Sequence, residues 1–115
     1  MTNNNIYFIA NWKMFGSVKS VNSLSKVISY SKVKKLKAKI IYCPPYTLIK
    51  YFVDKTKNSS IEIGAQDCHA QPNYGPFTGS ISSKMIKDLG GKFVIIGHSE
   101  TRKENDNKKI NLKIK

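Results

Sequence analysis

Short apolar runs alternate along this chain with stretches of helical period. Runs of strand length lie at residues 6–10, 38–43, 61–65 and 93–97. Between them, apolar side chains recur three or four positions apart, which is the spacing of an amphipathic helix. The three sets are Val18, Val21, Leu24 and Ile28; Leu48, Ile49, Phe52 and Val53; and Ile81, Met85, Ile86 and Leu89. The pattern predicts strands and helices in strict alternation.

Turn and capping residues set the expected boundaries of these elements. Pro44 and Pro45 suit the start of the second helix, because proline is tolerated in a first turn. A loop rich in glycine and proline spans residues 67–79, and Gly90 with Gly91 ends the third helix. A fourth helix is expected to begin near residue 105 and to run to residue 115.

Four β/α units in sequence predict one α/β domain over residues 1–115 with a parallel sheet and right-handed crossovers. An open doubly wound sheet and a (β/α)8 barrel both begin in this way. Four units are half of such a barrel. Because the chain stops within an apolar-striped helix, we expect a truncated chain.

The net charge of +13 raises the question of nucleic-acid binding. Nineteen of the 20 basic residues are lysine, and Arg102 is the only arginine, the usual reader of bases and phosphates. The lysines are spread along the chain and are densest over residues 32–39. We therefore expect solvated lysines and no nucleic-acid partner, although the positive field would attract an anionic metabolite.

Membrane insertion and export are also not expected. No apolar run approaches the roughly 20 residues that a membrane span needs, and Met1–Asn5 lacks the features of a signal peptide. We expect a cytoplasmic protein with no membrane partner, in which Cys43 and Cys68 are free thiols.

Polar side chains that can carry chemistry follow three of the four predicted strands. In parallel α/β folds the carboxyl ends of the strands form the functional edge. The residues at those ends are Asn11 and Lys13 after the first strand, Gln66, Asp67 and His69 after the third, and His98, Ser99 and Glu100 after the fourth.

Lys13 could attract a phosphate and stabilise a developing oxyanion, or it could be one surface lysine among 19. Asn11 could orient Lys13 or bind substrate, or it could be a turn residue at the end of the strand. Trp12, between them, is expected to pack in the core.

His98 follows a buried strand and is the sharper candidate. Ser99 could cap a short helix whose N-terminus keeps the imidazole neutral and able to donate a hydrogen bond. A satisfied structural histidine is the alternative. Glu100 could be a buried carboxylate paired with Lys13, or simply an acidic residue in a first helical turn.

No metal or cofactor site is expected. His69 and Cys68 lack a second pair of ligands, which makes zinc binding improbable. The sequence has neither the dinucleotide glycine fingerprint nor a phosphate-binding Gly-Lys-Ser/Thr loop.

Four motifs in order and spacing resemble triosephosphate isomerase. They are ANWKM at residues 10–14, GAQDCH at 64–69, GPFTG at 75–79, and DLGG at 88–91 continuing to VIIGHSE at 94–100. The resemblance covers nearly the whole chain and implies the first four β/α units of a TIM barrel, the N-terminal half of a single domain.

The resemblance implies interconversion of dihydroxyacetone phosphate and D-glyceraldehyde 3-phosphate through an enediolate, without a cofactor. By motif, Asn11 and Lys13 would bind substrate, and His98 would polarise the carbonyl. Glu100 would support Lys13. The family is a standing example of catalysis by a neutral histidine.

The family's loop containing Phe77, Thr78 and Gly79 enters a second subunit, so a homodimer is implied. Its usual intersubunit glutamate and arginine are replaced here by Ser80 and Thr101. We therefore expect the dimer to depend more on loop insertion than on an ion pair.

Other departures limit the activity that is expected. The family's proton-abstracting glutamate lies on the sixth strand, beyond residue 115, so we predict that these residues alone are inactive. Asp67 replaces a usual asparagine, and a shortened stretch at 103–107 leaves Glu104 without a role. The alternative is a non-catalytic half-barrel that assembles through its open edge strands.

Overall fold

The fold is an alternation of strands and helices, as the sequence pattern predicts. The computed structural model describes residues 6–33, 38–102 and 106–114. The elements, with η denoting a 3-10 helix, are β1 (Ile6–Asn11), η1 (Val18–Ser23), α1 (Leu24–Val33), β2 (Ala38–Cys43), η2 (Tyr46–Leu48), α2 (Ile49–Thr56), β3 (Glu62–Ala65), α3 (Ser83–Asp88), β4 (Phe93–Val94), η3 (Ser99–Thr101) and α4 (Asn107–Ile114). Met1–Asn5, the lysines at 34, 35 and 37, and Glu104 lie outside the described residues.

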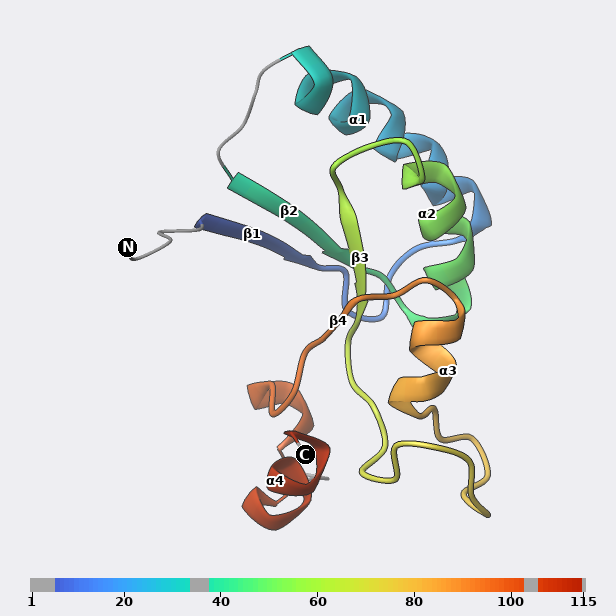
Figure 1. The fold of residues 1–115 in the computed structure, drawn as a ribbon, viewed down its shortest axis with the longest axis vertical. Coiled ribbons are helices and arrows are strands. Elements are labelled where there is room, and N and C mark those ends of the chain that lie inside the picture. Colours follow the sequence, from blue (N-terminus) through green and yellow to red (C-terminus); the bar gives the residue numbers. More distant parts are fainter. Residues whose placement is uncertain (1–5, 34–37, 103–105, 115) are drawn as a thin grey trace.

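The four strands form one parallel sheet in the order β1-β2-β3-β4. The register pairs Ile6 with Ala38 and Asn11 with Cys43, and then Ile41 with Glu62 and Gly64 with Phe93 across the next two pairs. Every crossover therefore joins adjacent parallel strands. The helices α1, α2 and α3 lie along one side of the sheet, and within the described residues no helix packs on the opposite side (Figure 1).

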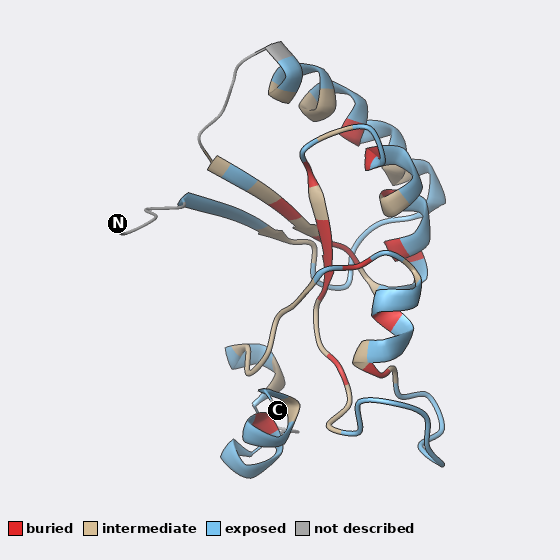
Figure 2. Ribbon diagram, viewed as in Figure 1, coloured by how far each residue is buried: buried red, intermediate tan, exposed pale blue. Residues whose placement is uncertain are grey.

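The core lies between the sheet and these helices. Phe52 and Ile49 of α2 and Ala65 of β3 are fully buried, and Leu24 and Ile86 bring α1 and α3 into the same cluster. Figure 2 shows the buried positions concentrated on β3 and on the inner faces of the helices. This burial removes the apolar stripes of the helices from water, which is the main stabilising contribution here.

Several element boundaries differ from the sequence prediction. The first two helices begin as 3-10 turns, η1 and η2, before they become α-helical. The fourth strand was expected over 93–97 but has ladder pairing only at Phe93–Val94. Ile95 still donates its N–H to Ala65 O at 2.9 Å, and no described strand pairs with the outer side of β4. The strand therefore loses its regular pairing early.

The two cysteines are free, as predicted, and both are buried. Burial raises the pKa of the Cys43 thiol to about 11. Trp12 also behaves as expected, because its ring packs edge-on against Phe52 at 5.0 Å and Tyr42 at 6.4 Å between centroids. None of the described helices has the length and apolarity needed to cross a membrane.

Candidate active site

The loop after β1 holds Lys13 in a conformation that few side chains adopt. Lys13 has a φ of 57°, the only positive value at a non-glycine residue in the described part of the chain. Its backbone N–H donates to Asn11 Oδ1 at 2.9 Å. A left-handed lysine costs free energy, so it persists only where its surroundings fix it. Asn11 supplies part of that support.

Gln66 also supports the backbone conformation of Lys13. Its side-chain amide donates to the carbonyl oxygens of Lys13 at 2.8 Å and Cys43 at 2.9 Å. Trp12 also donates its backbone N–H to the Cys43 carbonyl at 3.1 Å. One glutamine at the end of β3 therefore ties the loop after β1 to the end of β2. The sequence pattern predicted that Gln66 lies at this edge of the sheet, but it gave no indication of the role of this residue.

Lys13 and Glu100 form an ion pair across the mouth of the sheet, with 2.8 Å between Nζ and Oε1. The hydrogen bond from Lys13 holds the pKa of the Glu100 carboxyl below its ordinary value, and the positive charge of Lys13 adds to the effect. Both side chains are 53% exposed. Of the two alternatives considered for Glu100, each is met in part: the residue pairs with Lys13 and also lies in the first turn of η3, but its carboxylate is not buried, because the mouth of the sheet is open to solvent.

His98 itself caps the short helix η3. Its Nδ1 accepts a hydrogen bond from the Glu100 backbone N–H at 3.1 Å. A nitrogen that accepts from an N–H carries no proton, so we assign a neutral imidazole with its proton on Nε2. The expectation that Ser99 caps this helix was wrong. His98 occupies the capping position, and Ser99 is the first residue of the helix.

The turn around His98 is fixed by further hydrogen bonds. Thr101 donates both its backbone N–H and its Oγ1 hydroxyl to the His98 carbonyl oxygen, each at 2.9 Å. Arg102 Nε donates to the carbonyl oxygen of Gly97, which has a φ of 72°. The orientation of the imidazole therefore follows from backbone geometry.

His69 and Asp67 lie outside this group of residues. His69 stacks on Phe77 at 4.2 Å between ring centroids, and its Nδ1 accepts from the Gln71 N–H. Asp67 pairs with Lys113, whose side chain is only 6% exposed, at 2.8 Å. The described residues contain no cluster of three or more metal-binding side chains.

The edge of the sheet thus presents an ammonium group beside a neutral imidazole. Such a pair can attract an anion and donate to an oxygen on which charge develops. A family model of triosephosphate isomerase matches residues 6–115. The chain belongs to the triosephosphate isomerase family. The matched range includes the segments at the ends of β1 and β4.

Individual relatives agree with this assignment. The triosephosphate isomerase of Wolbachia pipientis wMel is 40% identical over 106 residues, which are 91% of this chain and 41% of the relative. That of Clostridium botulinum strain Loch Maree is 38% identical over 107 residues, 91% of this chain and 42% of the relative. The chain spans about two fifths of the length of these curated relatives.

A solved structure gives the same fold. The crystal structure of triosephosphate isomerase from Bartonella henselae matches with a TM-score of 0.85 at 33% identity, covering 96% of this chain and 46% of that one. The prediction of the first four β/α units of a TIM barrel is therefore confirmed. The curvature of the four-stranded sheet is that of a barrel wall.

Proposed function

We propose that this chain carries the electrophilic side of a triosephosphate isomerase site, acting on dihydroxyacetone phosphate and D-glyceraldehyde 3-phosphate through an enediolate. The single observation that carries the proposal is the meeting of Lys13 with Glu100 beside a neutral His98. Membership of the family supports the identity of the substrate, and the positive charge of the chain suits an anionic one.

Each residue has a distinct role in this proposal. Lys13 Nζ attracts the phosphate-bearing substrate and offsets the negative charge of the enediolate. His98 donates its Nε2 proton toward the substrate carbonyl oxygen and shuttles protons between the two oxygens. A positioned donor of this kind is typically worth about 3–4 kcal/mol of transition-state stabilisation. Asn11 binds substrate and orients Lys13, and Glu100 positions the ammonium group.

Proton abstraction from carbon needs a further group. Glu100 is poorly suited to act as that base, because its carboxylate is bound to Lys13 and its pKa is lowered. In the family a glutamate on the sixth strand does this work. We therefore expect that residues 1–115 alone do not turn over substrate. The complete site would need the remaining β/α units of the barrel.

Three properties of the family complete the proposal. Phe77, Thr78 and Gly79 would enter a second subunit in a homodimer, since Phe77 and its neighbours in this loop are exposed. The activity would belong to glycolysis and gluconeogenesis in the cytoplasm. It would need neither a metal ion nor an organic cofactor.

A chimera tests the catalytic roles directly. Residues 6–115 of this chain would replace the matching segment of the Wolbachia pipientis wMel enzyme, and isomerisation would be assayed. We expect turnover in the chimera and a loss of at least a hundredfold with Lys13→Met or His98→Gln. Lys92→Met, which removes a surface lysine 64% exposed, is the matched control and should retain activity. Equal activity in all the variants would refute the assignment.

A further inference from the structure

The β3–α3 loop, residues 69–81, is closed on itself at its two ends. The backbone N–H of His69 donates to the carbonyl oxygen of Ile81 at 2.8 Å, so the first and last residues of the loop meet. Residues 71–80 between them are all exposed (Figure 2). Because so little of this loop is buried, its shape depends on a small number of contacts.

His69 makes two of these contacts with one ring. Its imidazole stacks on the ring of Phe77, with 4.2 Å between the centroids and 25° between the planes. Its Nδ1 accepts a hydrogen bond from the backbone N–H of Gln71 at 2.9 Å. A nitrogen that accepts from an N–H carries no proton, so the ring is neutral in this arrangement, with its proton on Nε2. The imidazole therefore restrains the loop at two points.

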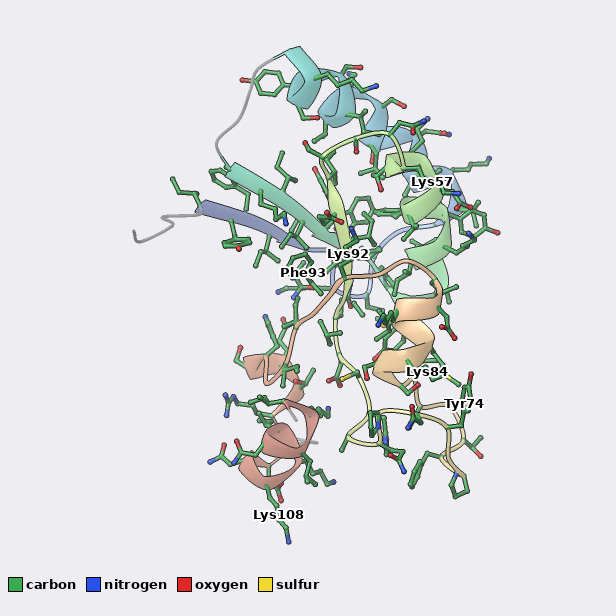
Figure 3. The ribbon with its side chains drawn as sticks, in the orientation of Figure 1. Lys57, Tyr74, Lys84, Lys92, Phe93 and Lys108 are labelled. Atoms are coloured by element: carbon green, nitrogen blue, oxygen red, sulfur yellow. The ribbon has the colours of Figure 1, made fainter. Side chains whose placement is uncertain are left out.

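The first half of the loop has a second anchor, which does not involve His69. Lys84 of α3 donates its backbone N–H to the carbonyl oxygen of Pro72 at 3.2 Å. The Nζ atom of Lys84 also lies 5.8 Å from the centroid of the Tyr74 ring, and both side chains are labelled in Figure 3. Residues 72–74 are therefore held against α3 whatever the state of the imidazole.

Phe77, in the second half, is held differently. Its side chain is 46% exposed and packs on Gly75, where an added Cβ would lie 2.7 Å from the Phe77 Cε2 atom. Gly75 belongs to the same exposed segment and gives no connection to the rest of the fold. Of these two contacts, only the stack on His69 joins the Phe77 ring to the base of the loop.

We propose that His69 is an acid-sensitive latch of the β3–α3 loop. In the neutral form its ring holds Gln71 and Phe77 in place, and protonation at Nδ1 releases both. The released segment contains Phe77 and its neighbours, through which the homodimer proposed above would form. The consequence for subunit association rests on that proposed homodimer, whereas the opening of the loop does not.

The chemistry of imidazole gives the latch its direction. Histidine is the side chain whose charge ordinarily changes between about pH 5 and pH 8. Once Nδ1 carries a proton, it is a donor that faces a second donor, the Gln71 N–H, and the hydrogen bond is replaced by repulsion. The latch is thus closed on the alkaline side of the titration of His69 and opens as pH falls through it.

Stacking alone does not hold the ring after protonation. A cationic imidazole is still attracted to the face of a phenyl ring. The ring must nevertheless turn, to move Nδ1–H away from the Gln71 N–H and to hydrate its two donors. An open cleft of about 550 Å³ adjoins His69 and gives the ring room to do so. We therefore expect the stack on Phe77 to be lost together with the hydrogen bond.

The charged groups around His69 do not compensate for its protonation. The titratable side chains that line the clefts on its two sides are Tyr46, Asp67, Cys68, Tyr74, Lys109 and Lys113. The one carboxylate among them, Asp67, is bound to Lys113 at 2.8 Å. Burial raises the pKa of the Tyr46 hydroxyl and that of the Cys68 thiol, so neither becomes an anion in the range where histidine titrates.

His98 has the same local arrangement and provides a control. Its Nδ1 also accepts from the backbone N–H two residues ahead, and these are the two histidines of the chain. At His98, however, the Oε2 atom of Glu100 lies 3.6 Å from Nδ1, so a protonated ring would have a partner already in place. Removal of His98 should leave the latch at His69 unchanged.

NMR between about pH 8 and pH 5 tests the latch on the unaltered chain. The Gln71 amide proton and the Phe77 ring protons should shift with the same midpoint as the His69 ring. The nuclear Overhauser contact between the two rings should fall about tenfold, since a hydrogen bond is lost without replacement. These changes should persist in His98→Gln. They should vanish in His69→Phe, which retains a ring for stacking but has no nitrogen to protonate.

Either of two results would overturn the latch. In one, His69 takes up its proton while the signals of Gln71 and Phe77 stay where they are. In the other, the loop responds to pH with the same midpoint in His69→Phe. The first result needs no variant to fold, and both are read whether or not the chain dimerises. Failure of the latch is therefore separate from failure of the homodimer, which sedimentation equilibrium measures independently.

Discussion

Lys13 and Glu100 stand 87 positions apart in the sequence, and their side chains meet at 2.8 Å. The contact joins the loop after the first strand of the sheet to the turn after the fourth. Because these strands lie at opposite edges of the sheet, the two side chains can meet only if the sheet is curved. The contact also brings two residues of the candidate site together. Its partners are exposed, so its value lies in positioning and not in stability.

The pKa of Glu100 offers a direct test of this pair. Carbon-13 NMR should show the carboxyl titrating below its ordinary value, and the value should return to normal in Lys13→Met. The contact should be intact above the lowered pKa and lost as pH falls through it. Asp54, whose pKa is lowered by its hydrogen bond with Lys50, should titrate unchanged in that variant. A Glu100 pKa indifferent to Lys13 would contradict the structure.

Alkaline pH should destabilise the fold through Cys43. Burial raises the pKa of this thiol from 9.0 to about 11, so the unfolded chain loses its proton first. The contribution to stability is present below pH 9 and is lost as pH rises toward and through 11. The loss should be on the order of 2 kcal/mol, measured by urea unfolding. Cys43→Ala should show a shallower decline over the same range, and an unchanged slope would exclude this thiol.

The strands and helices could be predicted from the sequence, because the spacing of apolar residues and the positions of turn residues indicated the same elements. The stripe over Leu48, Ile49 and Phe52 is buried as predicted, and Gly90 follows the end of α3. The 3-10 openings and the early end of β4 were not predicted. They depend on which neighbours each segment meets, and a single sequence does not state that.

Two glycines allow backbone strain to be separated from steric crowding. Gly90 has a φ of 98°, and an added Cβ would lie 2.7 Å from Val53 Cγ1. Gly79 has a φ of 84° with nothing within 4 Å. Gly79→Ala should therefore cost about 1–2 kcal/mol from strain alone, and Gly90→Ala should cost about 1–3 kcal/mol more from overpacking. Equal losses in urea unfolding would show that the Val53 contact relaxes without cost.

Phe52 should be the most sensitive position in the core. It is fully buried and packs edge-on against Trp12, which adjoins Lys13. Phe52→Ala should cost about 3–5 kcal/mol, a large share of the stability of a small domain. Tyr51→Ala removes a neighbouring aromatic ring that is exposed, and it should change stability little. Comparable effects of the two changes would contradict the assignment of the core.

The sequence was sufficient to predict which residues lie in the candidate site, but not their backbone conformations or hydrogen bonds. Motifs placed Asn11, Lys13 and His98 at one edge, since parallel strands bring their carboxyl ends together. The left-handed backbone of Lys13 and the two hydrogen bonds from Gln66 had no signal in residue type. Capping by His98 also went unrecognised, because serine is the commoner capping residue and stood next to it.

Binding of dihydroxyacetone phosphate to the chain tests the central claim most directly. In a titration followed by nitrogen-15 NMR, the signals of Lys13, His98 and Asn11 should shift together and saturate. Lys13→Met should abolish the shifts, and Lys92→Met should leave them unchanged. No shift at these three residues would contradict the account, as would equal shifts at lysines over the whole surface.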